Sequence, residues 1–392
     1  MIKLYRITSE RIILMKQKNI LILMLNFLKG EMFLSIAALL AIISSFFVHP
    51  DMQYMGYIDF RTLSLLVCLM AVTAGLQDTS VFRCLAERLL TKVHSQIGFI
   101  FILVMLCFFT SMLITNDVAL ITFVPFTFTV LSLLGKTAKQ RLIIPVVVLQ
   151  TLAANLGSML TPIGNPQNLY LYGVLGTGFG QFILIMLPYT AASLILLCIH
   201  IFICCKKGQF TTNTDIIGNS LGNKRSIFSY LLMFAVCLLS VTRVIDYKVM
   251  LVIIILGIIA VNYKILFKVD YTLILTFIAF FIFIGNMSRI ESFSSYIGRA
   301  IYGRECITGI LASQVISNVP ATLLLSGFTN NYHDLIIGVN LGGLGTLIAS
   351  MASLISFKYI GKEDKTLCGK YLLYFTISNL AYLAILFLLY IL

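Results

Sequence analysis

The sequence predicts an all-α polytopic membrane protein, built as an inverted-topology repeat with about nine transmembrane helices and two re-entrant helical hairpins. Hydrophobic residues make up 59% of its 392 residues and charged residues only 11%, which is more apolar surface than a soluble fold can bury. A polar stretch inside an apolar run, Ile114-Thr115-Asn116-Asp117, is partly repeated as Ile316-Ser317-Asn318. Each copy is followed by the pattern N-L-G-(S/G)-x-x-T, at residues 155–161 and 340–346. Two matched pairs in the same order indicate an internal repeat.

Composition also excludes several classes of function. The formal net charge of +13 does not indicate nucleic-acid binding, because the basic residues lie in short loops between apolar segments, as the positive-inside rule expects. The nine cysteines form no C-x-x-C pair and lie mostly in apolar segments, so we expect neither a disulfide framework nor a metal site. The four histidines are isolated. An enzyme embedded in the membrane would need a nucleophile–base pair or metal ligands at depth, and this scatter of residues supplies neither.

The first elements alternate between apolar and basic character. Residues 1–30 are basic, and their apolar run 20–28 is too short to span, so we expect an interfacial helix on the cytoplasmic side. The segments 31–48 and 60–76 are predicted to cross outward and back, because the loop between them carries no Lys or Arg. Residues 81–91 combine helical apolar spacing with basic residues, which is typical of a helix along the membrane surface.

The next apolar segment, 97–134, has basic residues on both sides and therefore enters and leaves on the cytoplasmic side. Two full spans with a tight external turn would also satisfy this charge pattern. The second copy favours a hairpin over two full spans, because its arms at 307–316 and 321–327 are far shorter than the roughly 20 residues of a span. We therefore interpret both segments as re-entrant hairpins, with tips at 115–117 and 317–320.

A long segment at 142–173 and its counterpart at 335–357 are predicted to be broken helices. The first of them contains five helix-breaking residues: Pro145, Gly157, Pro162, Gly164 and Pro166. Irregular backbone at membrane depth is tolerated only where it is buried in protein or lines a cavity.

A polar connector at 206–226 separates the first repeat, 31–205, from the second, 227–392, and its basic ends place it in the cytoplasm. After the first broken helix, residues 182–205 are predicted to span. The second repeat has spans at 227–241, 249–261, 271–287 and 371–391, with a surface helix at 289–304. The N-terminus is then cytoplasmic and the C-terminus outside, and the hairpins enter from opposite faces, as an inverted repeat requires.

The polar residues at the tips and breaks are the candidate site residues. In secondary transporters, half-helix N-termini attract anions and freed carbonyls coordinate Na⁺ near the midplane. Candidate substrate-binding residues are Thr115, Asn116, Asn165, Gln167, Asn168, Ser317, Asn318 and Ser350. Candidate ion-coupling residues are Asp117, Asn116, Asn155, Gly157, Asn318, Asn340 and Gly342. Alternatively, such residues only satisfy hydrogen bonds between packed helices, the reading we favour for Ser158, Ser350 or Ser353 taken alone.

Asp117 is the only charged residue between positions 97 and 134. A carboxylate at membrane depth costs at least about 2.5 kcal/mol and is usually functional. Such a group can hold either a proton or a sodium ion. The matched position in the second copy is the uncharged Val319, so the two copies differ in charge at this position.

The motifs T-N-D-V-A, N-L-G-S-x-L-T-P-x-G-N-P-Q-N and S-N-V-P-A resemble the citrate-transporter-like permeases over roughly residues 30–392. These belong to the superfamily of divalent anion:sodium symporters, arsenite permeases and one type of sodium/proton antiporter. The resemblance implies an elevator-type carrier with a scaffold and a mobile part that contains both hairpins. In the dicarboxylate symporters both tips read Ser-Asn-Thr and build sodium and carboxylate sites. Thr115, Asn116, Ser317 and Asn318 match that pattern, whereas Asp117 and Val319 depart from it, which argues against the usual two-sodium site and leaves proton coupling open.

We therefore expect a secondary active transporter in the cell membrane that moves a small anion, a carboxylate or an inorganic oxyanion, coupled to Na⁺ or H⁺. The alternative within transport is a cation/proton antiporter, in which Asp117 would exchange H⁺ for Na⁺. No cofactor is expected beyond the coupling ion. The expected partners are the lipid bilayer and the anion, with a homodimer left open and nucleic acid excluded.

Overall fold

The computed structural model describes residues 31–90, 93, 95–133, 136–176, 178–204 and 222–392. These residues form helices joined by turns, with no β-strand among them. Eight of the described helices are long and apolar enough to cross a membrane. The chain is thus an all-α polytopic membrane protein. The predicted interfacial helix at 20–28 and most of the connector at 206–226 lie outside the described residues.

The helices follow the predicted segments closely, because each long apolar run is bounded by polar or helix-breaking residues. The first half contains α2 (Met32–Phe47), α3 (Tyr54–Tyr57), α4 (Phe60–Asp78), α5 (Val81–Leu90), α6 (Gln96–Ile114), α7 (Asn116–Leu133), α8 (Lys136–Ser158), η1 (Pro162–Gly164), α9 (Pro166–Leu175) and α10 (Phe179–Cys204). The second half contains α11 (Lys224–Val241), α12 (Tyr247–Asn262), η3 (Tyr263–Lys268), α13 (Tyr271–Ser288), α14 (Glu291–Ile301), α15 (Glu305–Ile316), α16 (Asn318–Ser326), α17 (Tyr332–Leu341), η4 (Leu347–Ala349), α18 (Met351–Glu363), η5 (Lys365–Leu367) and α19 (Cys368–Ile391).

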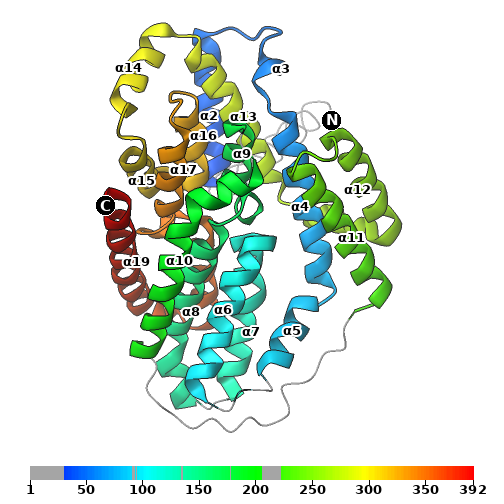
Figure 1. Cartoon of the computed structure of the whole chain (residues 1–392), viewed down its shortest axis with the longest axis vertical. Helices are drawn as coiled ribbons and strands as arrows, with labels where there is room; N and C mark the ends of the chain where they lie inside the picture. The colour runs from blue at the N-terminus through cyan, green and yellow to red at the C-terminus, as the bar shows by residue number, and fades with distance from the viewer. Residues whose placement is uncertain (1–30, 91–92, 94, 134–135, 177, 205–221) are drawn as a thin grey trace, which may run out of the picture.

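The two hairpins differ in arm length. In the second, α15 has 12 residues and α16 has nine, as the short apolar runs predict. In the first, α6 has 19 residues and α7 has 18, so α6 is itself long enough to span. The tip between α6 and α7 is nevertheless packed inside the protein, where Asn116 is only 3% exposed. Figure 1 shows α6 and α7 rising from one end of the molecule and α15 and α16 occupying the other half. Re-entrance into a membrane stays a prediction.

Burial separates a central helix from peripheral ones. In the most apolar 18-residue stretch of α8, 83% of the residues are buried, whereas in that of the helix that begins at Tyr247 only 22% are buried. Both α6 and α7 pack along α8, α2 packs along α13, and α11 and α12 pack against α4 (Figure 1). The outer faces of α10, α12 and α19 carry exposed Leu, Ile and Phe side chains, which suit contact with lipid.

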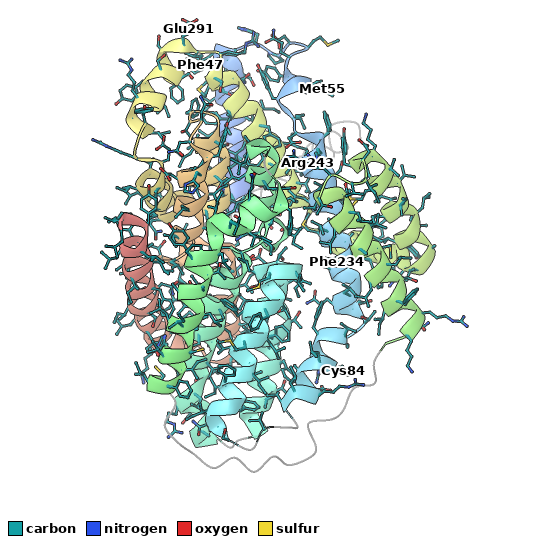
Figure 2. All side chains as sticks on the ribbon, in the orientation of Figure 1. Phe47, Met55, Cys84, Phe234, Arg243 and Glu291 are labelled. Atoms are coloured by element: carbon teal, nitrogen blue, oxygen red, sulfur yellow. The ribbon has the colours of Figure 1, made fainter. Side chains whose placement is uncertain are left out.

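Matched capping residues open α4 and α13, the helices that precede each hairpin unit. Asp59 accepts a hydrogen bond from the Thr62 backbone N–H, and Asp270 accepts one from the Leu273 backbone N–H. Each helix is followed by a short amphipathic helix, α5 or α14. Figure 2 places Cys84 of α5 and Glu291 of α14 toward opposite ends of the molecule, which agrees with two halves of opposite direction.

Ion pairs between distant segments agree with the predicted topology. Three of them are Lys139–Glu363, Lys268–Asp78 and Arg289–Asp51. In each pair the sequence predicts both partners on the same side of the membrane. The pairs are partly exposed, so each contributes at most about 1 kcal/mol to stability. Which end of the molecule faces the cytoplasm stays a prediction.

Candidate functional site

Both hairpin tips have the same unusual backbone conformation. Thr115 has φ 78° and ψ 151°, and Ser317 has φ 71° and ψ 154°. Residues other than glycine rarely adopt this region, which costs about 1–3 kcal/mol and persists only where the surroundings enforce it. Only four described residues other than glycine have positive φ, and two of them occupy these matched positions. The shared strain supports the internal repeat.

An asparagine follows each strained residue, and its side chain accepts a hydrogen bond from a backbone N–H at the start of the next helix. Asn116 Oδ1 accepts a hydrogen bond from the Asp117 backbone N–H at 2.9 Å, and Asn318 Oδ1 accepts one from the Val319 N–H at 3.0 Å. Each asparagine is the first residue of its helix, so its side chain caps the helix from within the first turn. Pro320 lies in the first turn of α16, where its missing N–H is tolerated.

The two broken helices meet the hairpins through matched hydrogen bonds. Thr161 donates to the backbone carbonyl of Met112 at 2.5 Å, and Thr346 donates to that of Gln314 at 3.1 Å. Each accepting carbonyl lies three residues before the strained tip residue. The two joints between a break and a hairpin therefore have the same construction.

The second break contains no proline and is stabilised differently, by a residue that the motifs did not indicate. Gln314 Nε2 donates to the carbonyls of Gly342 and Leu344, both at 2.9 Å. Its Oε1 accepts from the Thr346 N–H at 2.9 Å. Gln314 thus provides partners for backbone groups that the helix end leaves unpaired. The only signal available in sequence was an amide side chain within a short apolar arm.

Gly157 and Gly342 permit close packing between a break and a hairpin arm. A Cβ at position 157 would lie 2.1 Å from the Phe108 carbonyl oxygen, and one at 342 would lie 2.6 Å from Ser313 Oγ. The geometry thus gives both glycines a packing role, while their predicted role in ion coupling stays a proposal.

The Gly157→Ala substitution is therefore expected to destabilise the protein by about 3 kcal/mol, because the obstructing atom belongs to the backbone and cannot rotate away. Gly342→Ala should cost less, since its nearest obstruction is the Ser313 side chain and the backbone oxygen of Gly338 lies farther away, at 2.9 Å. Gly178→Ala, where the added carbon meets nothing within 4 Å, is the control. Thermal unfolding of the purified variants checks this order, and equal midpoints for Gly157→Ala and Gly178→Ala would contradict it.

A buried hydrogen-bond network joins the first tip to both broken helices. Asn155 Oδ1 accepts from Asn116 Nδ2 at 3.1 Å and from Ser350 Oγ at 2.9 Å. Asn155 lies near the end of α8, and Ser350 directly precedes α18. Asn155 Nδ2 has no hydrogen-bond partner among the described residues. The network therefore brings together three predicted site residues and leaves one buried donor free for a ligand.

A second network links the two breaks. Asn340 Nδ2 donates to Asn168 Oδ1 at 2.8 Å, and Gln167 Nε2 lies 3.4 Å from Asn340 Oδ1. Asn168 Nδ2 contacts the carbonyls of Ser158, Met159 and Thr161 at 3.3–3.4 Å. Asn168 and Asn340 are thus occupied in holding the breaks together. Asn165 is buried at the start of α9, where its side chain makes no capping hydrogen bond.

A cavity of about 20 Å³ lies beside the second tip, at the junction of α2, α13, α16 and α18. It is lined by Glu31, Phe33, Leu34, Asp270, Thr272, Leu273, Thr276, Ser317, Val319, Pro320 and Met351. This space is about that of one water molecule or small ion. None of these lining residues is basic, and Glu31 and Asp270 are acidic. The sequence motifs did not indicate these two acids, because only the tertiary fold brings them to the tip.

Asp117 lies in the first turn of α7, where the helix dipole favours a negative charge. Its Oδ1 atom is buried and has no hydrogen-bond partner in the part of the chain that the structure describes. No ion pair among the described residues includes Asp117. This arrangement suits a bound proton or cation.

Comparison with known protein families decides the class of the protein. A family model described as citrate transporter matches residues 20–332. The chain belongs to the citrate transporter family. This match includes both hairpin tips and the first broken helix, and it confirms the resemblance that the motifs indicate. A citrate transporter family chain with these apolar helices is a multi-pass membrane transporter.

Two relatives agree with the membership in the citrate transporter family. An uncharacterized transporter of Methanocaldococcus jannaschii is 34% identical over 328 residues, covering 83% of this chain and 88% of the relative. The inner membrane protein YbiR of Escherichia coli is 32% identical over 357 residues, covering 89% of this chain and 93% of the relative. The family and the first relative point to transport and away from enzymatic activity.

Proposed function

We propose that the protein is a secondary active transporter that moves a small anion by an elevator-type mechanism, coupled to Na⁺ or H⁺. The observation that carries this proposal is the pair of identically strained tips, Thr115 and Ser317, each packed against a broken helix. Strained backbone of this kind occurs at ligand sites, where the fold enforces it. Broken helices of both repeats near one point are the usual construction of a carrier site.

The chemistry of the tips favours an anion as substrate. The helices α7, α16 and α18 begin at the networks and the cavity described above, and helix N-termini present free N–H groups and partial positive charge. The side chains of Thr115, Asn116, Ser317, Asn318 and Ser350 add hydroxyl and amide groups. Citrate is the first carboxylate to test, because of the family's description.

The acidic residues near the tips favour coupling to a cation. An anion placed near Asp117, Asp270 and Glu31 would be repelled unless a proton or Na⁺ were bound with it. Asp117 is the proposed coupling residue, with Asn155 and Asn340 at the breaks as further candidates. The anion and the cation would thus be carried in the same direction, as in a symporter.

An elevator mechanism requires a scaffold and a mobile part. We assign α2, α4 and α11–α13 to the scaffold and both hairpins with α8, α9, α17 and α18 to the mobile part. The hydrogen bonds Asn155–Ser350 and Asn168–Asn340 tie the two repeats together within the mobile part. The cytoplasmic N-terminus and external C-terminus rest on the distribution of basic residues.

The cation/proton antiporter is the second candidate function. It is favoured by one observation, namely that the charged residues lining the cavity beside the second tip, Glu31 and Asp270, are both acidic. An antiporter would need no organic substrate.

Transport by purified protein in proteoliposomes separates the two functions. We expect radiolabelled citrate, or another small anion in a panel of carboxylates and oxyanions, to accumulate only under an inward Na⁺ or H⁺ gradient. Protein-free liposomes and equal ion concentrations on both sides are the controls. Internal pH changes driven by Na⁺ alone, with no anion accumulated, would replace the symporter with the antiporter.

A further inference from the structure

A second, larger cavity lies away from the tips, between α14, the start of α15, the end of α16 and the start of α17. Its volume is about 780 Å³. It is lined by Ser294, Gly298, Tyr302, Glu305, Ser326, Gly327, Phe328, Thr329, Asn330, Asn331 and Tyr332. Hydroxyl and amide groups dominate this lining. Glu305 is its one ionisable carboxylate, and no Lys, Arg or His is among these lining residues.

Glu305 is buried in the cavity wall, with 2% of its surface exposed. Its Oε1 atom accepts a hydrogen bond from Thr329 Oγ1 at 3.0 Å. Its Oε2 atom is buried and has no partner among the described residues. None of the ion pairs in the described part of the chain includes Glu305. A buried carboxylate with one unpaired oxygen is costly unless a cation or further donors compensate it.

Glu305 lies at the N-terminus of a helix. Glu305 is the first residue of α15, and the positive end of a helix dipole stabilises a negative charge in the first turn. The following arm of the same hairpin ends at this cavity, where Ser326 Oγ lies 3.0 Å from the Tyr170 hydroxyl of α9. One lining residue, Ser326, is thus hydrogen-bonded to the helix that begins at the first break.

The lining selects one class of ligand. Oxygen ligands suit hard cations, and a single carboxylate with neutral oxygens supplies one negative charge, whereas Ca²⁺ sites commonly use several carboxylates. In the described ranges no group of three His, Cys, Asp or Glu residues could hold a metal ion. We propose that Glu305 and Thr329 bind a sodium ion in this cavity, at a site separate from the hairpin tips.

This site goes beyond the proposed function, because it does not depend on which substrate is moved or on which ion is coupled at Asp117. Its test is binding, not transport. Equilibrium binding of ²²Na⁺ is measured on purified full-length protein carrying Asp117→Asn, so that sodium binding at the hairpin tips contributes less to the signal. N-methyl-D-glucamine chloride replaces NaCl to hold the ionic strength constant.

The Asp117→Asn protein is expected to retain saturable ²²Na⁺ binding. Adding Glu305→Gln should weaken that binding by about tenfold or more, since a charged contact is lost while the shape is kept. Adding Thr329→Val should weaken it by a smaller factor, and Glu305→Asp should retain part of it. Na⁺-dependent thermal stabilisation should fall in the same order.

Three results would overturn the site. They are the absence of saturable Na⁺ binding in the Asp117→Asn protein, unchanged binding after Glu305→Gln, and a loss of thermal stability in Glu305→Gln that is equal with Na⁺ and with N-methyl-D-glucamine. The last result would make Glu305 only a helix-capping acid. If Glu305→Gln does not fold, the Thr329→Val and Glu305→Asp proteins decide, and unchanged binding in both overturns the proposal.

Discussion

Asn116→Ala is expected to reduce transport by at least about 100-fold while the protein stays folded and inserted. The substitution removes the acceptor for the Asp117 N–H and the donor to Asn155 Oδ1. Losing a helix cap costs about 1 kcal/mol and losing a hydrogen bond about as much, which a stable domain tolerates. A small displacement of site groups can nevertheless cost about 100-fold in rate. Initial uptake rates in proteoliposomes, normalised to inserted protein, measure the effect.

Three further variants separate the contacts of Asn116, test the second tip and provide a control. Asn116→Asp keeps the oxygen that caps α7 and loses the amide donor to Asn155, so a defect there isolates the bridge to the break. Asn318→Ala removes the cap of α16 and should also abolish transport. Thr129→Ala, on an exposed face of α7 where the hydroxyl bonds only to the Pro125 carbonyl, is the matched control. Wild-type uptake by Asn116→Ala would show that the first tip is only structural.

Sequence alone could locate the helices and the tips for different reasons. The helices follow from apolar runs between polar segments, a local property of the chain. The tips Thr115-Asn116 and Ser317-Asn318 could be found because they are repeated, and the strained backbone at both supports their correspondence. Arm length was harder to predict, because α6 and α7 form one continuous apolar run whose ends are marked only by charge.

The partners of the site residues could not be predicted, because they come from distant segments. Glu31 and Asp270 reach the second tip only through the packing of α2 against α13. Gln314 supports the second break through side-chain hydrogen bonds, whereas the first break contains prolines, so no shared motif marks it. Asn168, predicted as a substrate-binding residue, and Asn340, predicted as an ion-coupling residue, bond to each other in the structure, and both predicted roles stay predictions. Residue type alone does not distinguish a ligand amide from one that closes a break.

Asp117→Asn is expected to eliminate the dependence of uptake on the ion gradient and to leave at most slow exchange of substrate for substrate. The substitution keeps the shape of the side chain and removes its charge, so the residue can no longer gain or release a proton or attract Na⁺. Asp117 has a buried oxygen without a partner among the described residues, at the start of α7. Binding one cation there compensates the buried, unpartnered carboxylate charge. No equivalent charge exists at Val319, so the second tip cannot substitute for the first.

The decisive measurement compares accumulation against a gradient with counterflow exchange in the same proteoliposomes. Asp59→Asn is the matched control, because it removes the capping carboxylate of α4 that corresponds to Asp270 in the first half. Asp117→Glu keeps the charge and should retain coupling at a reduced rate. If Asp117→Asn still accumulates substrate against its gradient, coupling lies elsewhere, and the backbone around Asn155 and Asn340 becomes the leading candidate. If the variant loses both exchange and accumulation, Asp117 is instead assigned to substrate binding, because a residue that only couples the ion is not needed for exchange.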